Sequence, residues 1–149
     1  VEKHKPNLII MLGQSGGSDK VKLERVAINM MDAMRADNDG YTPDEVSIDE
    51  DGDTALFCNL PIKSLRTKIN EQNINVKLSN SCGLYVCNRL YYEALNICKE
   101  KSIRAIFVHL PFYEGQPSAK PEKPTIPLNE MTKSIQVIIE EIYDRYRKI

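Results

Sequence analysis

Residues 79–88 read SNSCGLYVCN, and they lie between an alternating apolar segment and a long helical pattern. The glycine permits a tight loop, so the stretch predicts a strand, a loop and then a helix whose first turn carries Cys87. A helix N-terminus has unpaired N–H groups and a partial positive charge, which favours a cysteine thiolate over the thiol. Cys87 is therefore the first candidate for a nucleophile.

A nucleophilic cysteine needs a base, and the chain has only two histidines. His4 lies in a charged amino-terminal stretch, whereas His109 ends the apolar run at residues 103–108. Such a run is typical of a buried strand, and side chains at the carboxyl ends of strands in an α/β sheet face the ligand crevice. The 22 residues from Cys87 to His109 have room for one helix, a turn and a returning strand. We therefore expect these two side chains to converge.

Length and composition fit one domain that spans residues 1–149, because 149 residues with 42% hydrophobic content can form a single core. The net charge is −1, with 20 basic and 21 acidic residues interspersed, so nucleic acid is not an expected partner. No segment approaches the ~18 apolar residues of a membrane span, and no signal segment opens the chain. We expect a cytoplasmic protein that does not bind membranes.

The four cysteines are expected to be reduced thiols, because a core-forming chain without a secretion signal has little use for disulfides. The spacing C-x4-C-x10-C lacks the paired C-x2-C knuckles of structural zinc sites, so we expect no metal site. Besides Cys87, the cysteines are interpreted as packing residues, namely Cys58, Cys82 and Cys98.

The rest of the chain alternates between extended and helical patterns, which predicts an α/β fold. Tyr91 and Tyr92 are interpreted as core or interface residues, and the terminal helix is expected to bury an apolar stripe at Met131, Ile135, Ile138, Ile139 and Ile142. The predicted elements are a strand at 8–12, a glycine loop at 13–17, an extended segment at 21–29 that carries Glu24, a hairpin joining 46–48 to 54–58, a helix at 60–69, a strand at 74–78, an exposed loop at 115–127 and a helix from about 128 to 147.

Three segments resemble the pyroglutamyl peptidase I family, also called pyrrolidone-carboxylate peptidase, a family of cysteine peptidases. Residues 13–29 are similar to its glutamate signature, residues 78–88 to its cysteine signature, and residues 107–111 to its histidine strand. The resemblance implies a three-layer α/β/α sandwich with a mainly parallel, mixed sheet. It further implies removal of pyroglutamate from the N-terminus of peptides, without a cofactor, by a protein that forms dimers or tetramers.

The resemblance also assigns roles to single residues. It implies Cys87 as the nucleophile, His109 as the general acid and base, and Glu24 as the carboxylate that orients His109. The implied substrate-binding residues are Tyr85 and Val86, which would line the pocket for the pyroglutamyl ring, and Gln14 on the glycine loop.

The chain also departs from the family pattern. It corresponds to roughly the last two-thirds of the usual length, and we expect it to lack the N-terminal strand and loop that help to close the ring pocket. Cys82 stands where the family has alanine, and Ser18 stands where the family favours arginine. Because this segment is expected to be missing, an alternative interpretation is a catalytically silent α/β module of the same family.

A second alternative belongs to another class of enzyme. Residues 13–17 read GQSGG and match the G-x-S-x-G pattern after a strand, so Ser15 is a candidate nucleophile of a serine hydrolase. That pattern requires an apolar helix directly after the serine, whereas residues 17–20 are polar and lead into an extended segment. The cysteine hypothesis is therefore preferred.

Overall fold

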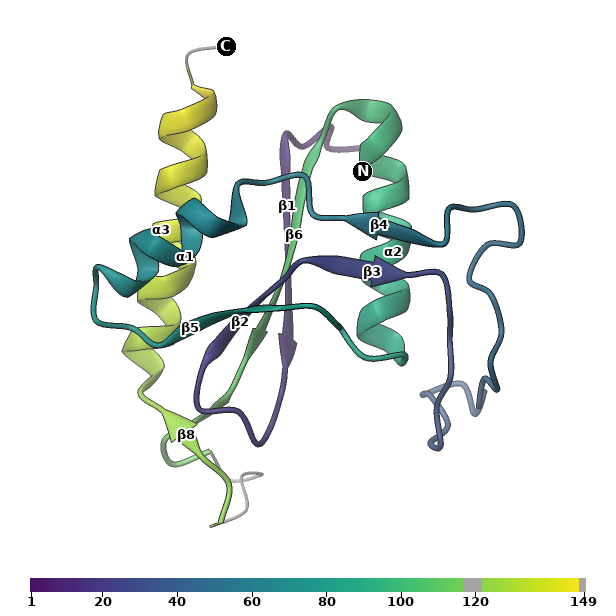
Figure 1. Cartoon of the computed structure of the whole chain (residues 1–149), viewed down its shortest axis with the longest axis horizontal. Helices are drawn as coiled ribbons and strands as arrows, with labels where there is room; N and C mark the ends of the chain where they lie inside the picture. The colour runs from purple at the N-terminus through teal and green to yellow at the C-terminus, as the bar shows by residue number, and fades with distance from the viewer. Residues whose placement is uncertain (117–121, 148–149) are drawn as a thin grey trace. The chain divides into compact units, whose positions relative to one another are not determined.

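The computed structural model describes residues 1–116 and 122–147, and Figure 1 traces the chain through its strands and helices. Four strands come first in the described chain, and helices and strands alternate from residue 62 to residue 110. In chain order the elements are β1 (Leu8–Gln14), β2 (Val21–Glu24), β3 (Val26–Ile28), β4 (Ala55–Phe57), α1 (Ile62–Asn70), β5 (Val76–Ser79), α2 (Val86–Lys101), β6 (Arg104–Leu110), β7 (Phe112–Tyr113), β8 (Thr125–Ile126) and α3 (Leu128–Tyr146).

The main sheet of the described residues has the strand order β1-β6-β2-β5. β2 runs antiparallel to β6, with Lys22 opposite His109 and Leu23 opposite Val108. Two smaller strand pairs accompany it: β3 is antiparallel to β4, and β7 is parallel to β8. A mixed sheet combined with helices confirms the predicted α/β class.

Strand β6 is buried along most of its length. Consecutive side chains point to opposite faces of a sheet, so a strand that is apolar at every position must be covered on both faces. Ala105, Ile106, Phe107 and Val108 are each at most 1% exposed, which confirms the predicted buried strand. His109 is part of this strand and is itself only 7% exposed, which is unusual for a polar side chain.

One compact unit, here called the first unit, consists of residues 1–11, 24–60 and 79–107. Its core lies where α2 contacts β3 and β4. Tyr91 packs against Phe107 with 5.8 Å between ring centroids, and its hydroxyl donates to the backbone carbonyl of Glu24 at 3.1 Å. The hydroxyl of Tyr92 donates to the carbonyl of Asp53 at 2.7 Å. Both tyrosines are core residues, as predicted, and both of their hydroxyls donate a hydrogen bond.

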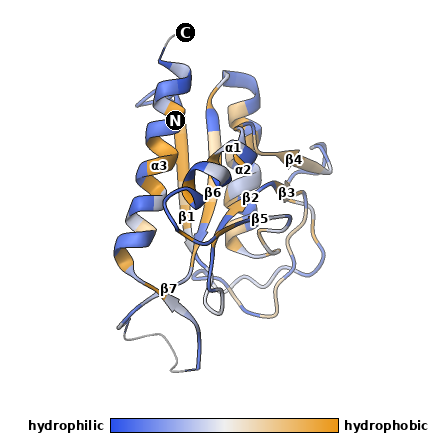
Figure 2. Ribbon diagram, turned by 60° about the vertical axis from the view of Figure 1, so that its left-hand side comes forward, coloured by the Kyte–Doolittle hydropathy of each residue, from blue (hydrophilic) through white to orange (hydrophobic). Residues whose placement is uncertain are grey.

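The second unit consists of residues 12–23, 61–78 and 108–149, of which 117–121 and 148–149 lie outside the described residues. Helix α1 packs on α3 and buries Leu65 and Ile69 completely. At the edge of this contact Arg145 donates to Ser64 at 3.2 Å and to Glu141 at 3.0 Å. Figure 2 shows apolar and polar segments alternating along α3, as expected of a helix with one buried face.

The buried face of α3 differs slightly from the predicted stripe. Met131, Ile138 and Ile142 are buried as predicted, whereas Ile139 is 48% exposed and Val137 is buried in its place. A helix turns by about 100° per residue, so Val137 and the buried Ser134 lie on one side of Met131 around the helix, whereas Ile139 lies on the other side.

We expect Ile138→Ala to lower the free energy of unfolding by about 2–5 kcal/mol, because it leaves a cavity at a fully buried position. Ile139→Ala is the matched control on the same helix and should change stability by less than about 1 kcal/mol. Urea unfolding followed by circular dichroism measures both variants. Equal losses for the two would contradict the observed orientation of α3.

The predicted hairpin between residues 46–48 and 54–58 is wrong. β4 pairs with β3 instead, and Val46 forms only an isolated bridge to Met31. The reason is the side chain of Asn29, whose Oδ1 accepts the N–H groups of Ile48 and Asp49 at 2.9 Å each. Because these N–H groups already donate to Asn29, they are not available for pairing with β4.

Smaller corrections concern the limits of three segments. β1 continues through Gln14, so the glycine loop begins later than predicted. The extended segment at 21–29 is two strands, β2 and β3, interrupted at Arg25. The predicted loop at 115–127 contains β8, and its residues 117–121 lie outside the described residues. Among the described residues, no helix combines the length and the apolar character that crossing a bilayer requires.

Candidate active site

Cys87 is the second residue of α2, so its predicted place in the first turn of a helix is confirmed. Strand β5 ends at Ser79, and Gly83 turns the connecting loop with a φ of 81°, a conformation that favours glycine. The Cys87 side chain is half-buried and packs against the core of the first unit.

Tyr85 and Val86 immediately precede Cys87 and are 39% and 50% exposed. The hydroxyl of Tyr85 donates to the backbone carbonyl of Ala36 at 2.8 Å. Both residues line a recess together with Met31 and Pro43. Their predicted role in binding the pyroglutamyl ring stays a prediction.

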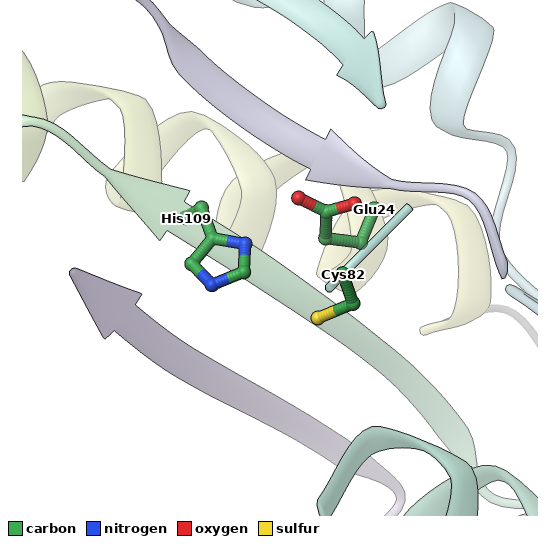
Figure 3. Close-up of side chains that lie close together, drawn as sticks. All are labelled: Glu24, Cys82 and His109. Atoms are coloured by element: carbon green, nitrogen blue, oxygen red, sulfur yellow. The ribbon is translucent and has the colours of Figure 1, made fainter. Parts of the chain in front are cut away.

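Glu24 and His109 are brought to neighbouring positions by the pairing of β2 with β6. The two strands are antiparallel, so Glu24 lies on the same face of the sheet as His109, diagonally across the Leu23–Val108 pair. The Glu24 side chain is completely buried and His109 is 7% exposed. Figure 3 shows the carboxylate, the imidazole and a third side chain close together, with one ligand atom of each within 4.8 Å of the others. A buried carboxylate beside an imidazole can fix its tautomer and stabilise its charged form.

The third member of this group is Cys82, which sequence analysis assigned to packing alone. Its thiol is 6% exposed, and together with Glu24 and His109 it offers a sulfur, an oxygen and a nitrogen ligand atom. Such a set is one that a zinc-like cation can use. The available signal was its place in the loop that leads to Cys87, but the path of that loop was not predictable. The approach of the Cys87 thiol itself to His109 stays a prediction.

The two other cysteines are confirmed as packing residues. Cys98 is 1% exposed, and Cys58 is half-buried with its thiol 3.4 Å from the carbonyl of Ala105. Burial raises the pKa of both thiols. Because a thiol with a raised pKa remains protonated at neutral pH, Cys58 and Cys98 are poor nucleophiles.

Gln14, the third predicted substrate-binding residue, lies at the end of β1 and is exposed. Its side-chain amide exchanges two hydrogen bonds with the amide of Gln116, at 2.9 and 3.1 Å. A substrate that uses the Gln14 amide must therefore replace this pair or extend it, and its role stays a prediction.

The arrangement around Ser15 argues against the serine hydrolase alternative. After Ser15 the chain turns and enters β2 at Val21, so the helix that a nucleophile elbow requires does not follow. The hydroxyl of Ser15 accepts a hydrogen bond from the ammonium of Lys22 at 2.7 Å. An ammonium is a donor only, so Lys22 in this charged form does not act as a base toward Ser15.

Comparison with known proteins gives a consistent result over nearly the whole chain. The sequence model of the family described as pyroglutamyl peptidase matches residues 1–145. A pyrrolidone-carboxylate peptidase of Clostridium perfringens is 40% identical over 144 residues, which are 95% of this chain and 68% of that protein. One from Thermosipho africanus is 38% identical over 148 residues, 98% of this chain and 72% of the relative.

Solved structures agree with these relatives. The pyrrolidone carboxyl peptidase from Thermococcus litoralis superposes with a TM-score of 0.92 at 29% identity, covering 99% of this chain and 70% of that one. The enzyme from Fervidobacterium islandicum gives a TM-score of 0.90 at 33% identity, with 96% and 72% covered. The chain that carries Cys87, His109 and Glu24 thus belongs to the pyroglutamyl peptidase family.

Proposed function

We propose that this chain is a cysteine-type exopeptidase that removes pyroglutamate from the N-terminus of peptides. The observation that carries the proposal is the family match, which spans residues 1–145 and therefore includes the glutamate and cysteine signatures and the histidine strand. Curated relatives at about 40% identity are named for the same activity. The reaction is hydrolysis of the amide bond that follows the pyroglutamyl group, and it needs no cofactor.

In the first half of the proposed reaction the Cys87 thiolate attacks the pyroglutamyl carbonyl carbon and a C–S bond forms. The C–N bond then breaks, and His109 gives a proton to the leaving amine of the shortened peptide. The product that remains on the protein is a pyroglutamyl thioester. Support for this role of Cys87 comes from its place in the first turn of α2 and from its partial exposure.

In the second half a water molecule attacks the thioester while His109 accepts its proton. The C–S bond breaks, pyroglutamic acid leaves, and the Cys87 thiolate and the protonated His109 are restored. Glu24 holds the imidazole in the tautomer that this exchange needs and stabilises the imidazolium that forms. The supporting observation is that these two buried side chains lie within 4.8 Å of each other at their ligand atoms.

The tetrahedral oxyanion of each step needs hydrogen-bond donors, and we assign them to the start of α2. The N–H groups of Asn88 and Arg89 donate to the carbonyl of Tyr85 at 3.1 and 3.3 Å. The N–H groups of Val86 and Cys87 precede them, where a helix has no intrahelical acceptors. Donors of this kind are each worth about 3 kcal/mol of transition-state stabilisation in comparable sites.

Substrate recognition is assigned to the residues beside the nucleophile. Pyroglutamate carries a lactam and no free amine, so its pocket should be mainly apolar with a few hydrogen-bonding groups. Tyr85 and Val86 offer exposed apolar surface next to Cys87, and Gln14 offers an amide that can pair with a lactam. We further propose a cytoplasmic protein that assembles as a dimer or tetramer, which sedimentation equilibrium tests.

Release of a fluorophore from pyroglutamyl, alanyl and prolyl conjugates tests the proposed activity. We expect turnover of the pyroglutamyl conjugate at least about 100-fold faster than that of the other two, because only a site built for the lactam gains its hydrogen bonds. Equal rates on all three would contradict the assigned specificity, and no turnover by the pure protein would favour the silent module. Neither that module nor the Ser15 hydrolase is favoured by the relatives, which are named as peptidases of this family.

A further inference from the structure

The side chain of Asn88 connects the first turn of α2 to strand β3. Its Nδ2 donates to the carbonyl of Ile28 at 2.8 Å and to that of Met30 at 2.9 Å, while its Oδ1 accepts the N–H of Ile28 at 3.0 Å. Asn88 is only 1% exposed, so water does not compete for these three hydrogen bonds. A buried amide with both ends engaged holds one orientation.

This contact takes the place of a neighbouring strand. β3 pairs with β4 along one edge, where Ile28 lies opposite Ala55. On the other side the Asn88 amide engages both the N–H and the carbonyl of Ile28, as a peptide group of another strand would. The start of α2 is thereby fixed directly to the backbone of β3.

The first turn of α2 has no side-chain cap, and the loop before it is held by a hydrogen bond from the N–H of Asp32 to the carbonyl of Leu84 at 3.0 Å. The residue that precedes the helix, Tyr85, makes no capping hydrogen bond with its side chain, which donates to Ala36 instead, and the first turn contains no acidic residue. A capping side chain would occupy the backbone N–H groups that the oxyanion needs in the proposed reaction. The Asn88 side chain instead binds β3 from the side of the first turn. The N–H groups at the helix start therefore stay available and are still held in place.

We infer that Asn88 is a positioning residue that sets the place of Cys87 and of the N–H groups beside it by fixing α2 to β3. The inference deepens the proposed function and rests on the assignment of Cys87 as the nucleophile. Cys87 is covalently adjacent, so a shift of the first turn moves its thiol and the oxyanion donors together. A misplacement of about 1 Å in a reacting group can cost about 100-fold in rate.

Asn88→Ala removes all three bonds and is expected to lower kcat by about 10- to 100-fold while KM changes by less than about twofold. The rate at which iodoacetamide alkylates Cys87, read by mass spectrometry, should fall by at least about threefold, because the first turn no longer holds the side chain in its half-exposed position. Asn59→Ala is the matched control in the first unit: Asn59 donates to Ile103 at 2.7 Å and accepts from Ala105 at 2.9 Å. Asn59→Ala should lose about as much stability as Asn88→Ala, but its kcat and its rate of Cys87 alkylation should stay unchanged.

Asn88→Asp is the second variant, because it keeps the shape and the acceptor for Ile28 but replaces both donated bonds by a carboxylate facing two carbonyl oxygens. It should also lower kcat and the alkylation rate. Three outcomes would overturn the inference in favour of a purely structural role. They are an unchanged kcat and alkylation rate in either folded Asn88 variant, an equal loss of both rates in Asn59→Ala, and failure of both Asn88 variants to fold. If the unmodified chain does not turn over the pyroglutamyl conjugate, the proposed function is refuted instead. The alkylation rate of Cys87 then tests by itself whether Asn88 positions the start of α2.

Discussion

Replacing Cys87 with alanine is expected to lower kcat on a pyroglutamyl conjugate by about 10⁴-fold or more, because it removes the atom that forms the thioester. The side chain is half-buried, so the smaller alanine should leave the fold intact. Initial rates of fluorophore release, with the free energy of unfolding measured on the same samples, separate loss of chemistry from loss of structure.

Cys98→Ala is the matched control, because it makes the same substitution in the same helix at a buried position. It should cost stability and leave kcat within about twofold. Ser15→Ala should also retain activity, since the hydroxyl of Ser15 accepts a hydrogen bond from the ammonium of Lys22, which is not a base. An active Cys87→Ala together with an inactive Ser15→Ala would instead establish the serine alternative.

A thiol-directed probe gives an independent view of the same site. Iodoacetamide should modify Cys87 well before Cys58 and Cys98, whose pKa values are raised by burial. Selective alkylation that also abolishes turnover would link the reactive thiol to the reaction. The same experiment shows whether Cys82, buried beside Glu24 and His109, shares this reactivity.

The elements that sequence predicted correctly are those with a strong local signal. Strand β6 is buried on both faces, so its sequence is a continuous apolar run. Helices α2 and α3 are buried on one face, so their apolar residues recur at helical spacing. Both patterns can be recognised from the sequence alone. The place of Cys87 in the first turn of α2 follows from the glycine loop before it. His109 was correctly expected to belong to a buried segment.

What sequence did not predict depends on contacts between distant residues. The partner of β4 is β3 because Asn29 binds the turn at residues 48–49, and no local pattern encodes that choice. The loop that brings Cys82 beside His109 has no periodicity from which its path can be deduced. Likewise, Asn88 stands in a helical pattern as an ordinary polar residue, although its hydrogen bonds reach a strand 60 residues earlier.

Replacing Glu24 with glutamine is the second substitution expected to have a large effect. The change preserves the shape but removes the negative charge, and an amide can present its N–H₂ group to the imidazole and favour the wrong tautomer. In Ser-His-Asp enzymes the equivalent change lowers kcat about 10⁴-fold, and we expect a loss of about 10³- to 10⁴-fold with little change in KM. Glu24 is fully buried, so solvent cannot take over its role.

The chain has only two histidines, so nitrogen-15 NMR of labelled histidine can follow the ring of His109 directly, with His4 as the internal reference. Glu24→Gln should alter the tautomer signals of His109 and leave those of His4 unchanged. Glu93→Gln is the control, because Glu93 pairs with Arg89 at 2.9 Å on the exposed surface of α2 and such a pair contributes little. If Glu24→Gln kept the wild-type kcat and His109 signals, the carboxylate would have no part in orienting the base, and the proposed triad would reduce to a Cys-His pair.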